Sequence, residues 1–148
     1  MIIQLQPSQI SSLWDMIKHG LIQSYKIPEG LRQDFAISQL GNLLSGMSQC
    51  WIGFTLDENG NKKIHFTSTT RIVADKYYGA KIMYVDSMYG FRFATPDLIK
   101  ELDEAITSFA KTSKCDVIIA LYTSSRVEEF LLSSGYEKYN MSARKVLK

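Results

Sequence analysis

The side chains that could do metal, acid–base or nucleophilic chemistry are scattered along this chain. His19 and His65 have no partner motif that would make either one a metal ligand or an acid–base catalyst. Cys50 and Cys115 follow no metal-ligand spacing, and cysteines of this kind usually behave as small, buried apolar residues. We therefore predict no metal site, and we expect two reduced, mostly buried thiols.

The remaining candidate pairs do not form a catalytic set either. Asp103 and Glu104 are neighbours in a predicted helix, and adjacent helical side chains do not face each other, so a carboxylate dyad is not expected. Ser124 and Ser125 lack a nucleophile-elbow motif and a matching His-Asp pair. No catalytic residue is predicted from these patterns.

One stretch nevertheless has the layout of a binding site. Ile82–Phe91 is rich in aromatic and β-branched residues and predicts a strand. Pro96–Phe109 has apolar residues at helical spacing, with Thr95 as the expected N-cap and Asp97 in the first turn. A strand, a short loop and a capped helix form the half-unit on which many α/β proteins bind an anion.

Side chains along this strand should alternate between the two faces of a sheet. One predicted face carries Tyr84, Asp86, Met88 and Gly90, and the other carries Met83, Val85, Ser87, Tyr89 and Phe91.

Periodicity and turn signals predict the other elements. In chain order they are a strand Ile2–Gln6, a helix from Pro7 to Tyr25, a helix from Leu31 to about Gly46, a hairpin of Cys50–Leu56 with Lys63–Ser68, a strand Asp116–Tyr122, a short helix from Ser124 to Leu132, and a last antiparallel pair, Tyr136–Met141 and Ala143–Leu147. The order β-α-α-β-β-β-α-β-α-β-β predicts one α/β domain over residues 1–148, with helices on both faces of a mixed sheet. Ile82–Phe91 should be central and parallel to Asp116–Tyr122.

Composition excludes some classes of partner. The 148 residues carry a net charge of +2, and the charges are interspersed, so nucleic-acid binding is not supported. Polar residues and Pro7 follow the first few residues where a signal peptide would have an apolar segment, and no apolar run approaches the ~20 residues of a membrane span. We expect a protein that works inside a cell, with no membrane contact.

The predicted order resembles the GCN5-related N-acetyltransferase (GNAT) fold over essentially the whole chain. Tyr84–Tyr89 resembles the family's central strand as it enters the acyl-CoA loop. Leu131–Lys138 resembles the family's late helix, which ends in a Gly-aromatic pair. The resemblance implies an acyl-CoA N-acyltransferase fold.

The chain departs from the family at the loop that holds the CoA pyrophosphate. The family has Arg/Gln-x-x-Gly-x-Gly/Ala there, because only glycine lets the backbone N–H groups approach the phosphates. In an ungapped alignment the Arg/Gln position is Gly90, and Phe93 and Thr95 replace the glycines. A shifted alignment starts at Arg92 but places Thr95 and Asp97 at the glycine positions. The loop is therefore degenerate.

A second departure concerns the general acid. Many family members have a tyrosine four residues before the Gly-aromatic pair, which protonates the departing thiolate. Here that position is Leu131, which cannot transfer a proton. Tyr122, Tyr136 and Tyr139 lie nearby in sequence, and nothing in the sequence selects among them.

These departures favour a non-catalytic, protein-binding pseudoenzyme without a cofactor. GNAT-like proteins with degenerate loops occur among bacteriophage-encoded head and internal virion proteins, and this chain looks like a relative of that kind. The resemblance then implies a protein partner in a viral assembly and a location in the host cytoplasm or the virion. The expected interaction patch consists of Tyr89, Phe91 and Phe93, because aromatic residues dominate interface hot spots.

The alternative is a divergent N-acyltransferase that transfers an acyl group from acetyl-CoA or another acyl-CoA to an amine. If CoA binds, the resemblance implies contacts from Val85, Ser87, Arg92, Phe93, Ala94 and Thr95.

Overall fold

A five-stranded mixed sheet with helices on both faces forms the centre of the computed structural model, which describes residues 1–90, 95–140 and 142–147. In chain order the elements are β1 (Ile2–Gln4), α1 (Pro7–Ser12), α2 (Trp14–Tyr25), a single 3₁₀ turn (Glu29–Leu31), α3 (Arg32–Leu44), β2 (Ser48–Leu56), β3 (Lys62–Asp75), β4 (Ala80–Gly90), α4 (Pro96–Thr112), β5 (Val117–Ala120) and α5 (Ser125–Ser133). The strands lie in the order β1-β2-β3-β4-β5. Neighbours are antiparallel except for β4 and β5, which are parallel, as the sequence predicted.

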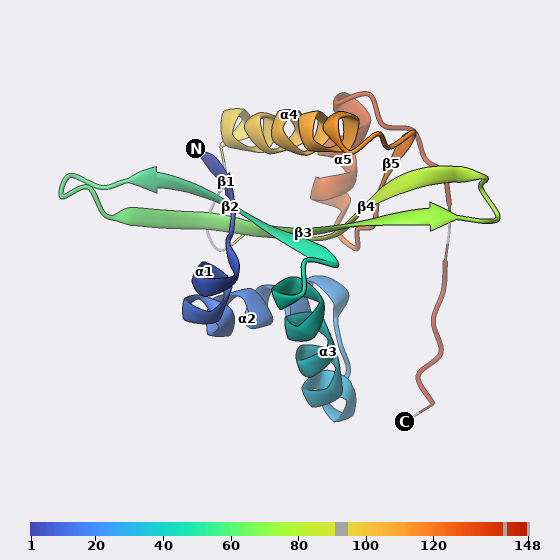
Figure 1. Ribbon diagram of the computed structural model, residues 1–148, viewed down its shortest axis with the longest axis horizontal. Coiled ribbons are helices and arrows are strands. Elements are labelled where there is room, and N and C mark those ends of the chain that lie inside the picture. Colours follow the sequence, from blue (N-terminus) through green and yellow to red (C-terminus); the bar gives the residue numbers. More distant parts are fainter. Residues whose placement is uncertain (91–94, 141, 148) are drawn as a thin grey trace.

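Two apolar cores lie on opposite sides of this sheet. Figure 1 shows α1, α2 and α3 below the sheet and α4 and α5 above it. The lower core packs Ile17 and Leu21 of α2 against Cys50 and Ile52 of β2. The upper core packs α4 against residues such as Met83 of β4. The sheet is therefore covered on both faces, and its ends and edges are the places left for a site.

Helix α4 forms as its sequence predicts. The Thr95 hydroxyl accepts a hydrogen bond from the Leu98 N–H at 3.3 Å, and Pro96 is the first helical residue. Leu98, Leu102 and Ile106 recur every four residues and are buried against the sheet. The cap and the apolar stripe are both local features, which explains why this element could be predicted.

The expected first helix is divided. It ends at Ser12 and restarts at Trp14, with Leu13 outside helical geometry between them. The Ser12 hydroxyl donates to the Gln9 carbonyl at 3.0 Å, and such side-chain bonds compete with the helical backbone ladder.

The predicted last pair of strands is wrong. Residues 136–140 and 142–147 run without regular structure, and no strand partner lies beside them in the described chain. Side chains make their long-range contacts: the Tyr136 hydroxyl donates to the Asp103 carboxylate at 2.9 Å, and Arg144 donates to the Tyr25 and Lys26 carbonyls at 3.0 and 2.6 Å. The strand pattern in this segment is real, but the tertiary contacts hold it away from the sheet.

Gly53 of β2 provides a direct test of the sheet packing. A Cβ at this position would overlap the ring of Phe66 on β3, which is buried. We expect Gly53→Ala to lower the free energy of unfolding by about 1–3 kcal/mol in a urea titration, because the core cannot accept extra volume there. The matched control is Gly41→Ala on α3, where the new methyl group meets nothing and should stabilise the helix by about 1 kcal/mol. Equal effects of the two changes would contradict this packing.

Candidate functional site

The candidate site begins where the two parallel strands separate. β4 and β5 pair from Ile82↔Val117 to Val85↔Ala120, and the Leu121 N–H then donates to the Val85 carbonyl at 2.9 Å. Beyond this point β4 continues to Gly90, whereas the chain after Ala120 turns away and pairs with no strand in the described residues. β5 therefore pairs with β4 only from Ile82 to Val85, and the same edge of β4 has no strand partner beyond Val85 in the described residues.

A β-bulge marks the point of separation. Thr70 of β3 lies opposite Val85 and Thr69 lies opposite Ser87, so Asp86 has no opposite residue. The bulge overturns the predicted alternation of side chains. Met88 packs in the α4 core with Val85, whereas Asp86 and Ser87 both lie on the α2 side of the sheet.

Asp86 is held by two partners on that side. Its carboxylate accepts a hydrogen bond from Arg71 Nε at 2.7 Å, and the Tyr25 hydroxyl at the end of α2 is the second donor. The carboxylate side chain is only 12% exposed. Burial raises the pKa of Asp86, and the positive charge of Arg71 and the two hydrogen bonds only partly offset this effect. A carboxyl group with a raised pKa is better able to accept a proton than an ordinary surface aspartate.

The two partners of Asp86 are themselves held in position. The Arg71 guanidinium lies over the Tyr84 ring, 4.3 Å from its centroid, and the Tyr84 hydroxyl donates to Asp75 at 3.3 Å. Burial, together with the negative charge of Asp86, raises the pKa of Tyr25, so this phenol stays protonated and can donate. The cluster is therefore pre-arranged around the carboxylate.

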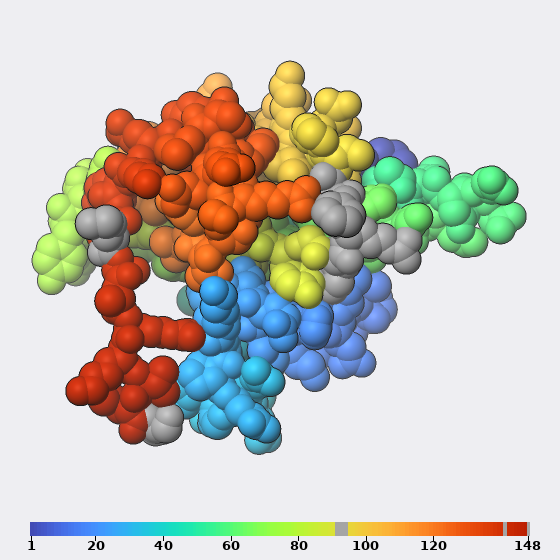
Figure 2. Space-filling model, turned by 180° about the vertical axis from the view of Figure 1, so that it is seen from behind, coloured from blue at the N-terminus to red at the C-terminus, as the bar shows by residue number. Residues whose placement is uncertain are grey.

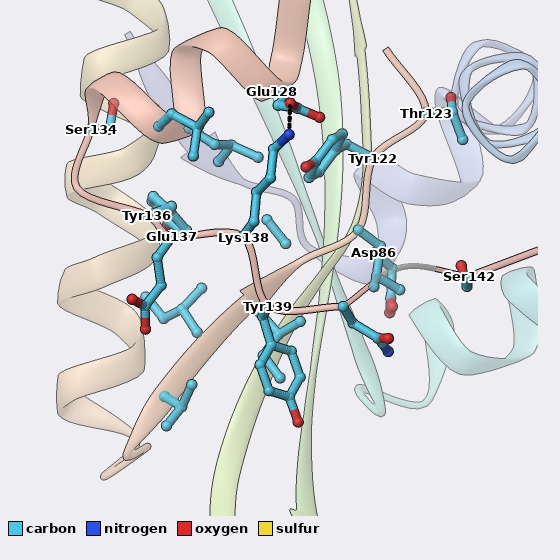
Figure 3. Close-up of a pocket in the computed structure, with 18 of the residues that line it drawn as sticks. Asp86, Tyr122, Thr123, Glu128, Ser134, Tyr136, Glu137, Lys138, Tyr139 and Ser142 are labelled. Carbon is cyan, nitrogen blue, oxygen red and sulfur yellow. Dashed lines mark ion pairs between the residues drawn. The ribbon is translucent and has the colours of Figure 1, made fainter. Parts of the chain in front are cut away.

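A pocket of about 1100 Å³ adjoins this cluster. Asp86 lies at its inner side, β5 and the three residues after it form one wall, and the C-terminal segment forms the opposite wall. Figure 3 shows Tyr122, Glu128 and Lys138 gathered above Asp86 in this view. Figure 2 shows the end of the C-terminal segment, in red, beside the blue part of the molecule, with open space between them above and below the point where they meet.

An ion pair, Lys138 with Glu128, and the neighbouring Tyr122 form a second polar cluster in the pocket. Lys138 Nζ lies 2.9 Å from Glu128 Oε1, and hydrogen bonding to Lys138 lowers the pKa of Glu128. A hydrogen bond to Glu128 raises the pKa of the Tyr122 phenol. Tyr122 therefore keeps its proton at neutral pH. It lies after β5, whereas Asp86 lies on β4.

The residues expected to contact CoA are only partly placed. Val85 and Ser87 are buried on opposite faces of β4, so their side chains do not act together, and Thr95 caps α4. Arg92, Phe93 and Ala94 lie outside the described residues.

Of the expected interaction patch, the structure describes only Tyr89. Tyr89 is half-buried against α2, with its ring 5.6 Å from the His19 ring in an edge-on contact. Phe91 and Phe93 lie outside the described residues, so the patch stays a prediction.

The structure distinguishes the three tyrosines that the sequence could not rank. Tyr136 donates to Asp103, Tyr122 is hydrogen-bonded to Glu128, and Tyr139 packs edge-on against Tyr78 with the ring centroids 5.8 Å apart. Tyr122 alone among them follows β5 directly, at the separation. Leu131, at the expected acid position, is buried in the core.

Sequence reasoning missed the Tyr25–Asp86–Arg71 cluster. The three residues come from α2, β4 and β3, and no local pattern connects them. One signal was available: Asp86 is the only charged residue between Ile82 and Gly90 in a strand otherwise suited to burial.

Several simpler functions find no support in the described part of the chain. Cys50 is buried as predicted, and burial raises its pKa to about 12, whereas Cys115 is only half-buried. No group of His, Cys, Asp and Glu in residues 1–90, 95–140 and 142–147 could hold a metal ion. Over the same residues, each helix is too short or too polar to cross a bilayer.

Comparison with solved structures decides the fold. A predicted acetyltransferase from Clostridium acetobutylicum, determined with acetyl-CoA, superposes with a TM-score of 0.70 at 16% identity, covering 99% of this chain and 96% of that one. The chain has the GNAT acetyltransferase fold. The aminoglycoside N-acetyltransferase AAC(6')-Iy in complex with CoA gives a TM-score of 0.69 at 12% identity, covering 99% and 93% of the two chains.

One further neighbour has a different acceptor in its name. The ribosomal-protein-alanine N-acetyltransferase from Brucella melitensis gives a TM-score of 0.65 at 13% identity, covering 100% of this chain and 98% of that chain. No protein-family model matches the sequence, and no curated protein matches it. At these identities the likeness establishes the GNAT fold alone.

Arg71 should control the acidity of Asp86. We expect Arg71→Leu to raise the pKa of Asp86 further, because a positive charge that favours the carboxylate is removed. Carbon-detected NMR titration of the Asp86 carboxyl would measure this change. Arg32→Leu on α3 removes a guanidinium that does not act on Asp86 and should leave the titration unchanged. An unchanged or lowered pKa in the Arg71 variant would contradict the ion pair.

Proposed function

We propose that the protein is an acyl-CoA-dependent N-acyltransferase with an altered mode of holding the donor. The observation that carries this proposal is the separation of β4 from β5 at a bulge that bears a buried, activated carboxylate beside a large pocket. Burying a carboxylate is costly, so its presence at this position favours a functional role. Strained or irregular strand positions with perturbed pKa values concentrate at functional sites.

The open edge of β4 suits the arm of an acyl-CoA. The two amides of the pantetheine arm need main-chain partners in an extended arrangement, and β4 beyond Val85 has such groups without a strand partner on that side in the described chain. The pyrophosphate is less well served, because the sequence has Phe93 and Thr95 where glycines would admit it. Asp97 in the first turn of α4 adds a negative charge near the same place. We infer that the strand contributes more to donor binding than the loop.

We propose two proton-transfer roles. The Leu121 N–H bonds the Val85 carbonyl, so the next residue on each arm, Asp86 and Tyr122, borders the same end of the pocket. The acyl donor supplies a thioester carbonyl there. Asp86 takes a proton from the acceptor amine as its nitrogen bonds to the acyl carbon, and Tyr122 protonates the sulfur as the carbon–sulfur bond breaks.

The first test separates donor binding through the arm from binding through the phosphates. Calorimetry with acetyl-CoA and with S-acetylpantetheine should give dissociation constants within about tenfold of each other, because the loop contributes little. Replacing Phe93 and Thr95 by glycine should tighten acetyl-CoA binding but leave S-acetylpantetheine binding unchanged; loss of the Thr95 cap to glycine costs only a few tenths of a kcal/mol. A thermal-shift assay at 100 times the dissociation constant should show stabilisation of about 2.7 kcal/mol.

The contrary outcome has a definite meaning. If neither donor raises the melting temperature at millimolar concentration, and no acyl transfer to a panel of amines is detected, the proposed activity is wrong. The non-catalytic, partner-binding role that the degenerate loop suggests would then be the better hypothesis. Its protein partner would be sought first in a phage assembly.

A further inference from the structure

The outer edge of β5 has a sequence that does not suit a free edge. Among the residues that the structure describes, β5 is the last strand of the sheet and pairs only with β4. Its residues, Val-Ile-Ile-Ala, include no charge and no proline, and all four are half-buried. Natural edge strands are normally protected by charges, prolines, bulges or a covering segment, because their main-chain groups would otherwise pair with another chain.

The pocket runs along this edge. Every residue from Val117 to Thr123 lines it, which means that the pocket follows the main chain of the strand and is not restricted to one set of side chains. Half of the N–H and C=O groups of a parallel strand point away from its partner, so β5, whose residues line this space, has such groups on its outer edge. At about 1100 Å³, the pocket is large for a small-molecule site.

The protein's own C-terminal segment does not take this position. Tyr136 is tied to Asp103 of α4, Lys138 to Glu128 of α5, and Arg144 to the carbonyls at the end of α2. These three attachments hold the segment across the pocket as its far wall. Within the described residues, no backbone hydrogen bond joins this segment to β5.

We propose that the pocket binds an extended polypeptide as a sixth strand, antiparallel to β5, and that this polypeptide is the acyl acceptor. The inference rests on the proposed function for the identity of the reaction, but the binding mode does not depend on it. An antiparallel strand places its N-terminus at the C-terminal end of β5, where Asp86 and Tyr122 lie. The acceptor is then the α-amine of a peptide, whose pKa of about 8 makes it easier to deprotonate than a lysine side chain.

Main-chain pairing can be tested with matched peptides and the unaltered full-length protein. The probe is the peptide Ala-Thr-Val-Thr-Val-Thr amide with a free α-amine, and two controls carry N-methyl groups either on both valines or on the first two threonines. Because only alternate N–H groups of a strand face its neighbour, one control should bind about tenfold or more weakly, and the other should bind like the probe. Fluorescence anisotropy without any acyl donor measures these affinities.

Other outcomes overturn the proposal in distinguishable ways. Equal binding by all three peptides, or by none, means that no strand is added at β5. Hydrogen exchange of the outward-facing β5 amides should be fast in the free protein and slow with the probe. Slow exchange in a free monomer would show that the protein's own C-terminal segment pairs there, and slow exchange in a dimer seen by light scattering would assign the edge to a second copy.

Acylation by acetyl-CoA supplies the separate readout for the reaction. The probe should be acetylated at its α-amine at least tenfold faster than alanine amide at equal concentration, because alanine amide cannot pair with β5. Peptide binding without acetylation of either amine would overturn the proposed function but not the binding site. Equal rates for the two amines would overturn the acceptor assignment.

Discussion

Asp86→Asn is expected to lower kcat/KM for acyl transfer by about 10²- to 10⁴-fold, the usual contribution of a positioned general base. The amide keeps the size of the side chain but cannot take a proton from the amine. The unaltered enzyme should also show an acidic limb in its pH–rate profile, centred on the raised pKa of Asp86. That limb should disappear in the variant. Steady-state kinetics across pH measures both effects.

Two controls separate this role from a structural one. Glu104→Gln removes an exposed carboxylate on α4 and should leave the rate unchanged. Stability should behave differently from activity. Because the folded protein raises the pKa of Asp86, the contribution of this one group to stability is greatest below its unfolded-state pKa and falls as the pH rises through the folded-state value. Asp86→Asn should abolish that fall. A variant with full activity would show that Asp86 is not the base.

Leu102→Ala is expected to lower the free energy of unfolding by about 2–5 kcal/mol, because it leaves a cavity where the core cannot fully relax. Leu102 is 2% exposed and packs in the cluster that joins α4 to Met83 and Val85 of β4. Urea denaturation monitored by circular dichroism measures the loss. The same packing sets the position of β4 beside the site, so the variant should also bind acyl donors more weakly.

The control for this change is Leu132→Ala on α5. Leu132 is 44% exposed, so its truncation removes little buried surface and should cost far less than the change at Leu102. If the two variants lost similar stability, the assignment of α4 as the main cover of the upper sheet face would be wrong.

Local chemistry was enough to predict most elements from the sequence. Thr95 and Pro96 mark the start of α4, because an N-cap and a first-turn proline act within a few residues. The four-residue spacing of Leu98, Leu102 and Ile106 predicts which side of the helix is buried. The β2–β3 hairpin follows from Asp57 and Gly60, whose bonds close the turn locally. The parallel pairing of β4 with β5 follows from two apolar strands joined by one helix.

Tertiary structure alone decided the site. The bulge at Asp86 depends on the register of β3 against β4, and a one-residue offset there changes the face of every later side chain, as Met88 and Tyr89 show. The partners of Asp86 are Tyr25 on α2 and Arg71 on β3, which are distant from it in the sequence. The C-terminal segment, which has the pattern of strands, is instead held across the pocket by Tyr136 and Arg144. Strand propensity is a local preference, and tertiary contacts elsewhere in the fold decide whether such a segment pairs with a strand edge.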